Sequence, residues 1–454
     1  MDQVIRGNAA ELLSCLVAEN LKVGGVFDLG NLAMVQLTFI AVQLAVTALF
    51  GTASAAELRV EVEQVTTGPK HHFFGYIGHV RTIPWNESGR YIVALRTDFQ
   101  DRMPTSADKA DVILIDTSNN DRARVVDQTR AWNFQQGTML YWNPAKPETQ
   151  FFFNDRDPAT NKTFVVLFDI SKGEHGERIR EYRYADSPIG NSGVAQNGGY
   201  FLGLNYARLA RLRPVTGYPG TWDWTAQEKH PENDGIFRVN VDTAAMELIV
   251  SFQQLRDAIR RTHPHVDDTA LFINHTLWNR DDNRIYFYAR GGWEPRIKNR
   301  INVPFTIRPD GSDLTQQKVF IGGHPEWESG PRMIGVVDEA QVIYDTDRQE
   351  IVDTLGDPAI FPVPGADIAL SPDGTWFVNG YREKGHNRYV LFRRSDAAYI
   401  RTRSFDQHGQ VNGELRNDPA PCWNRDGTQI LFPAFADDAE HTRQLFRLRL
   451  LPQD

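Results

Sequence analysis

Along most of the chain, a polar turn is followed by a short run in which apolar and polar residues alternate, and the same phrase returns several times. It reads IPWNESGRYIVAL from Ile83, LWNRDDNRIYFYA from Leu277 and CWNRDGTQILFPA from Cys422. Each copy contains a bulky apolar residue, a turn centred on Asp, Gly or Pro, and then an alternating strand. Alternation with period two buries one face of a pleated strand, so each copy predicts a strand–turn–strand unit.

The bulky apolar residue of each copy provides an anchor for counting. The equivalent anchors are Trp85, Trp142, Trp278, Trp327, Leu370 and Trp423. They are 57, 136, 49, 43 and 53 residues apart, and the step of 136 fits two units, because a degenerate copy begins at Val194 with its strand at Tyr200. Repeats of about 40–60 residues are typical of propeller blades, which are four-stranded sheets. The sequence therefore predicts an all-β, seven-bladed β-propeller.

The ring needs a strand from the beginning of the chain. After the last anchor only about thirty residues remain, which is enough for roughly three strands. The segment Leu58–Thr66 alternates cleanly, and we expect it to complete the last blade, so that no edge strand is left open. Residues 57–454 are thus predicted to form one propeller. Loop insertions follow the strand of blade three at 205–234 and 251–268, and the second opens with a helix that carries Leu255 and Ile259 on one face.

The first 56 residues differ from the repeats. An apolar run, Leu32–Phe50, is followed by GTASAAE, whose small residues suit a signal peptidase. We interpret residues 1–56 as a signal peptide or, alternatively, as an uncleaved N-terminal membrane anchor. The expected location is periplasmic or secreted. Cleavage would leave Cys422 as the one cysteine, so an internal disulfide is not expected.

Charge narrows the classes of partner. The formal net charge of −9 argues against nucleic acid as the main partner. A membrane is expected to be a partner only through an uncleaved N-terminal segment. An acidic ligand remains compatible with this charge, because its binding depends on the local field at the channel.

Candidate site residues occur at matching positions of different repeats. His275, His324 and Asp367 each stand three residues before an anchor, Asp418 stands two positions further back in the last repeat, and His79 stands six before the first anchor. These positions belong to the innermost strands, so we expect several blades to direct imidazoles and carboxylates toward one axis. The pattern predicts a metal site or an acid–base pair. Alternatively, these side chains only pin the inner strands together.

The repeats resemble two known propeller families. The W/L-[NS]-x-D-G unit resembles TolB-type repeats, and the order of polar residues is similar to that of oligogalacturonate lyase, a seven-bladed propeller family that cleaves oligouronates by β-elimination with a divalent metal, typically manganese. The resemblance implies that His275 is the catalytic base. It also implies that His324, in the sequence HPEW, is a metal ligand.

The chain departs from the lyase pattern at two places. The family's Gln-x-x-His-x-His segment in the last blade corresponds here to LRNDPA at residues 415–420, which leaves Asp418 as a ligand, with Asp367 as a further one. The family's catalytic arginine has no match in blade three, and we expect Arg208 or Arg211 of the insertion to take its place.

Together these observations predict an exported carbohydrate-active propeller that binds an acidic oligosaccharide, or another small ligand, at the channel mouth. Its expected activity is a metal-assisted lyase reaction on uronate oligosaccharides, with Mn or Ca as the metal. The alternative is a non-catalytic periplasmic binding or interaction propeller of the TolB type. Fold does not decide between them, because propellers host both kinds of function.

Overall fold

A computed structural model of the chain describes residues 58–75, 82–293 and 300–451. The described residues form one compact unit. The predicted signal peptide or anchor and His79 lie outside the described residues. In the described part of the chain, no helix is long and apolar enough to cross a membrane.

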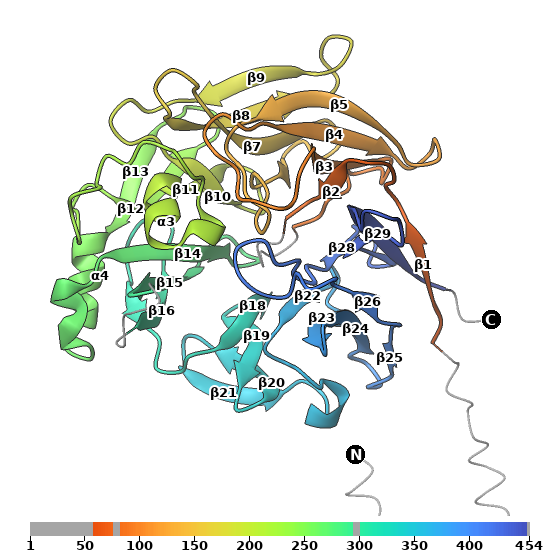
Figure 1. The fold of residues 1–454 in the computed structure, drawn as a ribbon. Coiled ribbons are helices and arrows are strands. Elements are labelled where there is room, and N and C mark those ends of the chain that lie inside the picture. Colours follow the sequence, from red (N-terminus) through yellow and green to blue (C-terminus); the bar gives the residue numbers. More distant parts are fainter. Residues whose placement is uncertain (1–57, 76–81, 294–299, 452–454) are drawn as a thin grey trace, which may run out of the picture. The chain divides into compact units, whose positions relative to one another are not determined.

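Seven antiparallel sheets form a ring of blades around a centre, as the sequence pattern predicted (Figure 1). In blades one to six the strands are paired in chain order, and the first strand of most blades contacts the first strand of the next, which makes it the innermost. Blade one contains β2 (His71–Phe73), β3 (Tyr91–Thr97), β4 (Ala110–Asp116) and β5 (Arg122–Thr129), and blade two contains β6 (Tyr141–Trp142), β7 (Gln150–Arg156), β8 (Thr163–Asp169) and β9 (Glu177–Tyr182). Blade three contains β10 (Gly190–Val194), β11 (Tyr200–Leu204), β12 (Gly235–Asn240) and β13 (Met246–Ser251). Blade four contains β14 (Leu271–Trp278), β15 (Ile285–Gly291), β16 (Ile301–Ile307) and β17 (Thr315–Gln316).

The remaining three blades follow the same plan. Blade five contains β18 (Gly322–Ser329), β19 (Arg332–Val337), β20 (Ala340–Asp345) and β21 (Glu350–Thr354). Blade six contains β22 (Asp367–Leu370), β23 (Trp376–Glu383), β24 (His386–Arg393) and β25 (Tyr399–Arg401), and the short β26 (Phe405–Asp406) also pairs with β24. Blade seven contains β27 (Cys422–Trp423), β28 (Gln429–Phe435) and β29 (Arg443–Leu450). Blade seven obtains its fourth, outer strand from β1 (Val60–Gln64).

The pairing of β1 confirms the predicted closure. This strand is antiparallel to β29, with a register that runs from Val60 opposite Leu450 to Gln64 opposite Phe446. Arg447 of β29 forms ion pairs with Glu63 of β1 and with Asp121 of blade one. The first and last parts of the propeller are therefore joined by a strand ladder and by charge pairs.

The tryptophan anchors explain why the sequence phrase repeats. Four of them donate an indole hydrogen bond to a main-chain oxygen of the preceding blade: Trp142 to Pro84 (2.7 Å), Trp278 to Gly193 (3.3 Å), Trp327 to Leu277 (2.9 Å) and Trp423 to Ala369 (3.1 Å). Each acceptor directly precedes the anchor position of its own blade. The anchors are also buried, so one residue type provides packing and a directed contact between neighbouring blades.

The insertions of blade three contain two helices. The predicted helix is α4 (Phe252–Ile259), which starts with a capping box of Ser251 and Gln254 and buries Leu255. A second helix, α3 (Tyr206–Leu212), was not predicted; Asn205 caps it, and its buried face packs inside the insertion. Short 3-10 turns lie at η1 (Pro214–Thr216), η2 (Pro264–Asp268) and η3 (Pro358–Ile360).

Candidate functional site

The loops of the propeller divide between two faces. Because neighbouring strands are antiparallel, the links from the second to the third strand of each blade, and the links to the next blade, open at one face. Both insertions lie at this face, which we call the insertion face; the opposite one is the turn face. Arg208, Arg211 and Asp418 come from loops of the insertion face. His324 and Asp367 lie near the starts of inner strands, at the same face.

Three of the predicted residues, from consecutive blades, meet at the inner strands. Nδ1 of His324 in blade five lies 2.5 Å from Oδ1 of Asp367 in blade six. The ring of His275 in blade four lies 4.9 Å from that of His324, measured between centroids. The second oxygen of Asp367 accepts a hydrogen bond of 2.8 Å from the main-chain nitrogen of Ala420, just before blade seven. We call His275, His324 and Asp367 the histidine group.

Irregular inner strands carry these imidazoles. In β14 the pairing register shifts between Asn274 and Leu277, and His275 has a φ of 57°, in the left-handed region. In β18 the register shifts between Gly322 and Glu326, which bracket His324. Bulges of this kind redirect side chains and are frequent beside functional sites. We infer that the two bulges set the directions of the two rings.

The geometry fixes the proton positions of one imidazole. Asp367 is 3% exposed. An ionised carboxylate only accepts hydrogen bonds, so Nδ1 of His324 is the donor and Nε2 is the acceptor of the neutral ring. A carboxylate that orients an imidazole in this way is the usual support of a general base. The contact with Asp367 therefore orients the His324 ring and sets which of its nitrogens carries the proton in the neutral form.

The described hydrogen bonds of the Asp418 carboxylate are to residues outside the histidine group. Its Oδ1 accepts a hydrogen bond of 2.9 Å from Arg416, and its Oδ2 accepts one of 2.8 Å from the amide of Gln135. A further guanidinium, that of Arg382 on β23, lies 3.8 Å away. Both carboxylate oxygens are thus engaged by protein donors, two of which come from other parts of the ring.

The two predicted catalytic arginines stabilise the insertion. Arg208 is 1% exposed and donates to the main-chain oxygens of Leu271 and Lys229, at 2.6 and 2.5 Å. Burial lowers the pKa of Arg208 to about 10. Nε of Arg211 donates to Asp223 at 3.0 Å. No described contact brings either guanidinium to the histidine group.

A group of arginines that the sequence pattern did not single out surrounds Trp293. The guanidinium carbons of Arg213, Arg290 and Arg300 lie 5.3, 5.2 and 5.3 Å from the centre of its indole ring. Arg213 follows α3 in blade three, whereas in blade four Arg290 lies on β15 and Arg300 directly precedes β16. Each cation–π contact is favourable, but three like charges around one ring repel each other. We call these residues the arginine group.

Arg213 is the least satisfied member of the arginine group. Its Nε is buried and has no hydrogen-bond partner among the described residues. Burial and, to a smaller extent, the charges of Arg290, Arg416 and Arg300 lower the pKa of Arg213 to about 10, and the charge of Asp418 opposes this shift. Arg213 is still charged at neutral pH. A buried polar atom without a partner requires an explanation, and a bound ligand is one. Residues 294–299, which include Glu294, lie outside the described residues.

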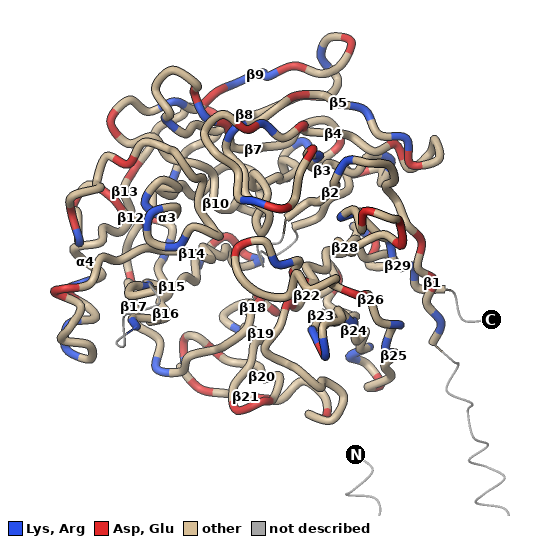
Figure 2. The backbone as a smooth tube through the Cα atoms, viewed as in Figure 1, with Lys and Arg blue, Asp and Glu red and all other residues tan. Residues whose placement is uncertain are grey.

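The arginine and histidine groups are adjacent. Nη1 of Arg290 donates to the side chain of Asn274 at 2.9 Å, and Asn274 directly precedes His275. On the other side, Asp418 and Ala420 belong to the loop between β26 and β27, which arches toward the middle of the ring (Figure 1). Figure 2 shows acidic and basic positions close together on this loop. The two groups therefore form one site at the axis of the insertion face.

The predicted divalent metal does not fit the donors at this site. Asp367 is bonded to Nδ1 of His324 and to the main chain of Ala420, and Asp418 is bonded to Arg416 and Gln135, so protein donors engage both predicted carboxylate ligands. In the described ranges, no group of three or more His, Cys, Asp or Glu residues is arranged to hold an ion. The field of the neighbouring arginines also opposes a cation. A bound Mn or Ca therefore remains a prediction of the sequence alone.

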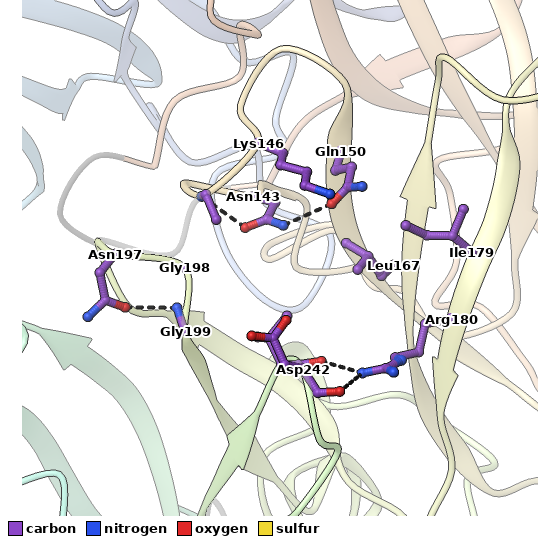
Figure 3. Close-up of a pocket in the computed structure, with 12 residues that line it drawn as sticks. Asn143, Lys146, Gln150, Leu167, Ile179, Arg180, Asn197, Gly198, Gly199 and Asp242 are labelled. Carbon is purple, nitrogen blue, oxygen red and sulfur yellow. Dashed lines mark hydrogen bonds between the residues drawn. The ribbon is translucent and has the colours of Figure 1, made fainter.

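A pocket at the turn face is a weaker candidate. It has a volume of about 410 Å³ between blades two and three, where it is bordered by Asn143, Gln150, Arg180 and Gly199 among others (Figure 3). Several of its polar side chains already have partners: Asn143 bonds Gln150 at 3.1 Å, and Arg180 donates to the main-chain oxygen of Val241 at 2.6 Å. We therefore place the candidate site at the insertion face.

Comparisons with known proteins add a limited similarity. No family model matches the chain, and no curated protein does. Among solved structures, TolB from Acinetobacter baumannii is 12% identical with a TM-score of 0.38, over 88% of this chain and 97% of that chain. A putative TolB from Agrobacterium tumefaciens is 12% identical with a TM-score of 0.36, over 87% and 99%. The β-propeller domain of the Trilobed protease from Pyrococcus furiosus is 11% identical with a TM-score of 0.40, over 84% and 99%. At these scores the fold assignment rests on the strand pairing described above, and no function follows from the similarity.

Proposed function

We propose that this propeller is a binding protein for an acidic oligosaccharide, which it holds at the axis of the insertion face. The observation that carries the proposal is the arginine group. Three guanidiniums lie within about 5 Å of one indole centre, and none of them takes part in a described ion pair. A cation cluster that the described residues leave unneutralised favours an anionic ligand.

The spread of charge favours a ligand with several acidic groups. Arg382, Arg416 and Arg443 surround Asp418 and extend the positive region beyond the arginine group. Arginine pairs well with carboxylates because its planar fork matches the two oxygens. An oligouronate carries carboxylates at regular intervals and therefore suits a row of guanidiniums. Nucleic acid is less suitable, because the protein as a whole carries a net charge of −9.

The proposal is tested by calorimetric titration with trigalacturonate and with its methyl ester, which is uncharged. The acidic trisaccharide should bind and the ester should not. Arg213→Met should weaken binding at least about tenfold, because one charge-assisted contact is lost. The exposed Arg300 provides a second variant, Arg300→Met, with less effect on folding.

Arg393 offers a matched control, because its guanidinium carbon lies 5.5 Å from the ring centre of Trp376, at the turn face. Arg393→Met should leave binding unchanged. Equal binding of the acid and the ester, or equal losses in Arg213→Met and Arg393→Met, contradicts the proposal.

The histidine group favours a second candidate function, β-elimination of the bound oligouronate. His324, oriented by Asp367, would take the proton next to the uronate carboxylate. The electron pair of the broken carbon–hydrogen bond would form the carbon–carbon double bond, and the sugar oxygen would leave with the pair of its own broken bond and take a proton from water. Nearby arginines would stabilise the charge that develops on the carboxylate. The absorbance of the unsaturated product tests this candidate, and a purified protein that binds trigalacturonate without producing it is a binding propeller only.

Export is part of the proposal and rests on the sequence of residues 1–56. An acidic polysaccharide fragment would be met in the periplasm or outside the cell. Mass spectrometry of the protein from the producing cell should find an N-terminus near Ala56 or Glu57. A soluble protein that retains Met1 contradicts export by cleavage.

A further inference from the structure

The carboxylate of Asp418 is held by groups from distant parts of the ring. Gln135 comes from the link between blades one and two, Arg382 from blade six, and Arg416 from the same loop as Asp418. Arg443, at the start of β29, is fully buried, and its Nε has no hydrogen-bond partner in the described part of the chain. The carboxylate of Asp418 therefore lies among the guanidiniums of Arg382 and Arg416 and the amide of Gln135, and these three groups make a socket for a carboxylate.

The loop does not depend on this carboxylate for its position. Asn417, 1% exposed, donates to the side chain of Gln407 at 2.9 Å. The main-chain oxygens of Leu415 and Asn417 accept hydrogen bonds from Arg443 and Arg382, at 2.9 and 2.6 Å. These contacts hold the main chain on both sides of residue 416. The Asp418 side chain, which is 15% exposed, can therefore turn away while the loop stays anchored.

The socket and the arginine group are close enough to serve one ligand. Asp418 and Arg416 both lie within electrostatic range of Arg213, which is itself part of the arginine group. An oligouronate of two or more residues presents a second carboxylate beside the first. When no ligand is bound, the carboxylate of Asp418 occupies the socket.

We propose that the socket of Gln135, Arg382 and Arg416 is a second carboxylate subsite, in which Asp418 stands in for a carboxylate of the ligand. This inference rests on the proposed function, and it adds that the ligand carries at least two carboxylates. A ligand carboxylate that enters the socket displaces Asp418 from Arg416. Asp418 thus lowers the affinity for the ligand and restricts the site to ligands that can replace it.

The test is a calorimetric titration of Asp418→Asn with trigalacturonate. This variant keeps the size of the side chain and removes its charge. It should bind at least about tenfold more tightly than the wild type, because the ligand no longer competes with a charged group for Arg416. Asp396→Asn is the matched control, since Asp396 pairs with Arg393 at 2.7 Å at the turn face and the change in net charge is the same. The control should leave the affinity unchanged.

A second variant changes a donor of the socket instead of the carboxylate that occupies it. Arg416→Gln removes a donor of the subsite and should weaken binding of trigalacturonate about tenfold while monogalacturonate, which needs one carboxylate contact, is little affected. Unchanged or weaker binding in Asp418→Asn, or an unchanged affinity in Arg416→Gln, overturns the inference. If trigalacturonate binding is sensitive to Arg213→Met but not to these changes, the inference fails and the proposed function stands. If neither the wild type nor Asp418→Asn binds, both fail.

Discussion

Nδ1 of His324 lies 2.5 Å from Oδ1 of Asp367, and this contact joins the inner strands of blades five and six. Asp367 also accepts a hydrogen bond from the main chain of Ala420, so one buried carboxylate links three consecutive blades. The proton position on the His324 imidazole therefore depends on how blades five, six and seven pack together.

We expect the neutral form of His324 to carry its proton on Nδ1. Long-range nitrogen–proton NMR of the ring should show this tautomer in the wild type. Asp367→Ala should abolish the preference and lower the free energy of unfolding by about 2 kcal/mol, because two donors lose their acceptor. A wild-type ring protonated on Nε2, or an unchanged stability in Asp367→Ala, would show that the contact does not form in solution.

Glu326 predicts a pH dependence of stability. This residue is 4% exposed; burial raises the pKa of its carboxyl to about 7, whereas the charge of Arg280 lowers it. A carboxyl whose pKa is raised in the folded state binds more protons there than when unfolded. The contribution of protonated Glu326 to the free energy of unfolding is therefore fully present below about pH 4.5 and is lost as the pH rises through 7.

Glu326→Gln should remove this dependence of the free energy of unfolding on pH. Between pH 5 and pH 8, urea titrations should show the wild type losing about 3 kcal/mol relative to the variant. Parallel pH profiles for the two proteins would mean that Glu326 is ionised throughout, in an ion pair with Arg280.

A substitution of Trp327 should show how much one indole contact between blades contributes to stability. Trp327→Phe removes the donor to the main-chain oxygen of Leu277 and part of a fully buried ring. The free energy of unfolding should fall by about 2–4 kcal/mol. Trp376 is partly exposed and is not an anchor, so Trp376→Phe should cost less than about 1 kcal/mol. Similar losses in the two variants would contradict the role of the anchors.

Much of the fold followed from the sequence, because its signals are local and repeated. The alternating strands, the closing segment Leu58–Thr66 and the helix at Leu255 were all predicted, and the structure confirms them. Helix α3 was missed because YARLARL is short and its cap, Asn205, is recognisable only once the preceding strand is known.

The site was predicted only in part. The histidine group came from matching positions in the repeats, which the ring symmetry brings together. The arginine group depends on the paths of insertions such as the segment before Arg213, and no repeat fixes those paths. Asp418 was predicted beside the histidines as a metal ligand, and in the structure its carboxylate accepts hydrogen bonds from Arg416, two residues earlier, and from Gln135.

Closure by β1 should be essential to the stability of the ring. Val62 lies on this strand and packs against the core beside blade seven. Val62→Asp should lower the free energy of unfolding by about 2–3 kcal/mol, because it places a charge at a half-buried apolar contact. The control is Val352→Asp, on the exposed outer strand of blade five, which should cost less than about 1 kcal/mol. Equal effects in chemical denaturation would mean that β1 does not close the ring in solution.

The most direct measurement of the central claim is a crystal structure of the protein with trigalacturonate. It should show ligand carboxylates bonded to Arg213 and Arg300 beside Trp293, and the Asp418 side chain turned away from Arg416. Ligand bound at the turn face, or an insertion-face site that stays unchanged at saturating trigalacturonate, would contradict the claim that the arginine group is the binding site.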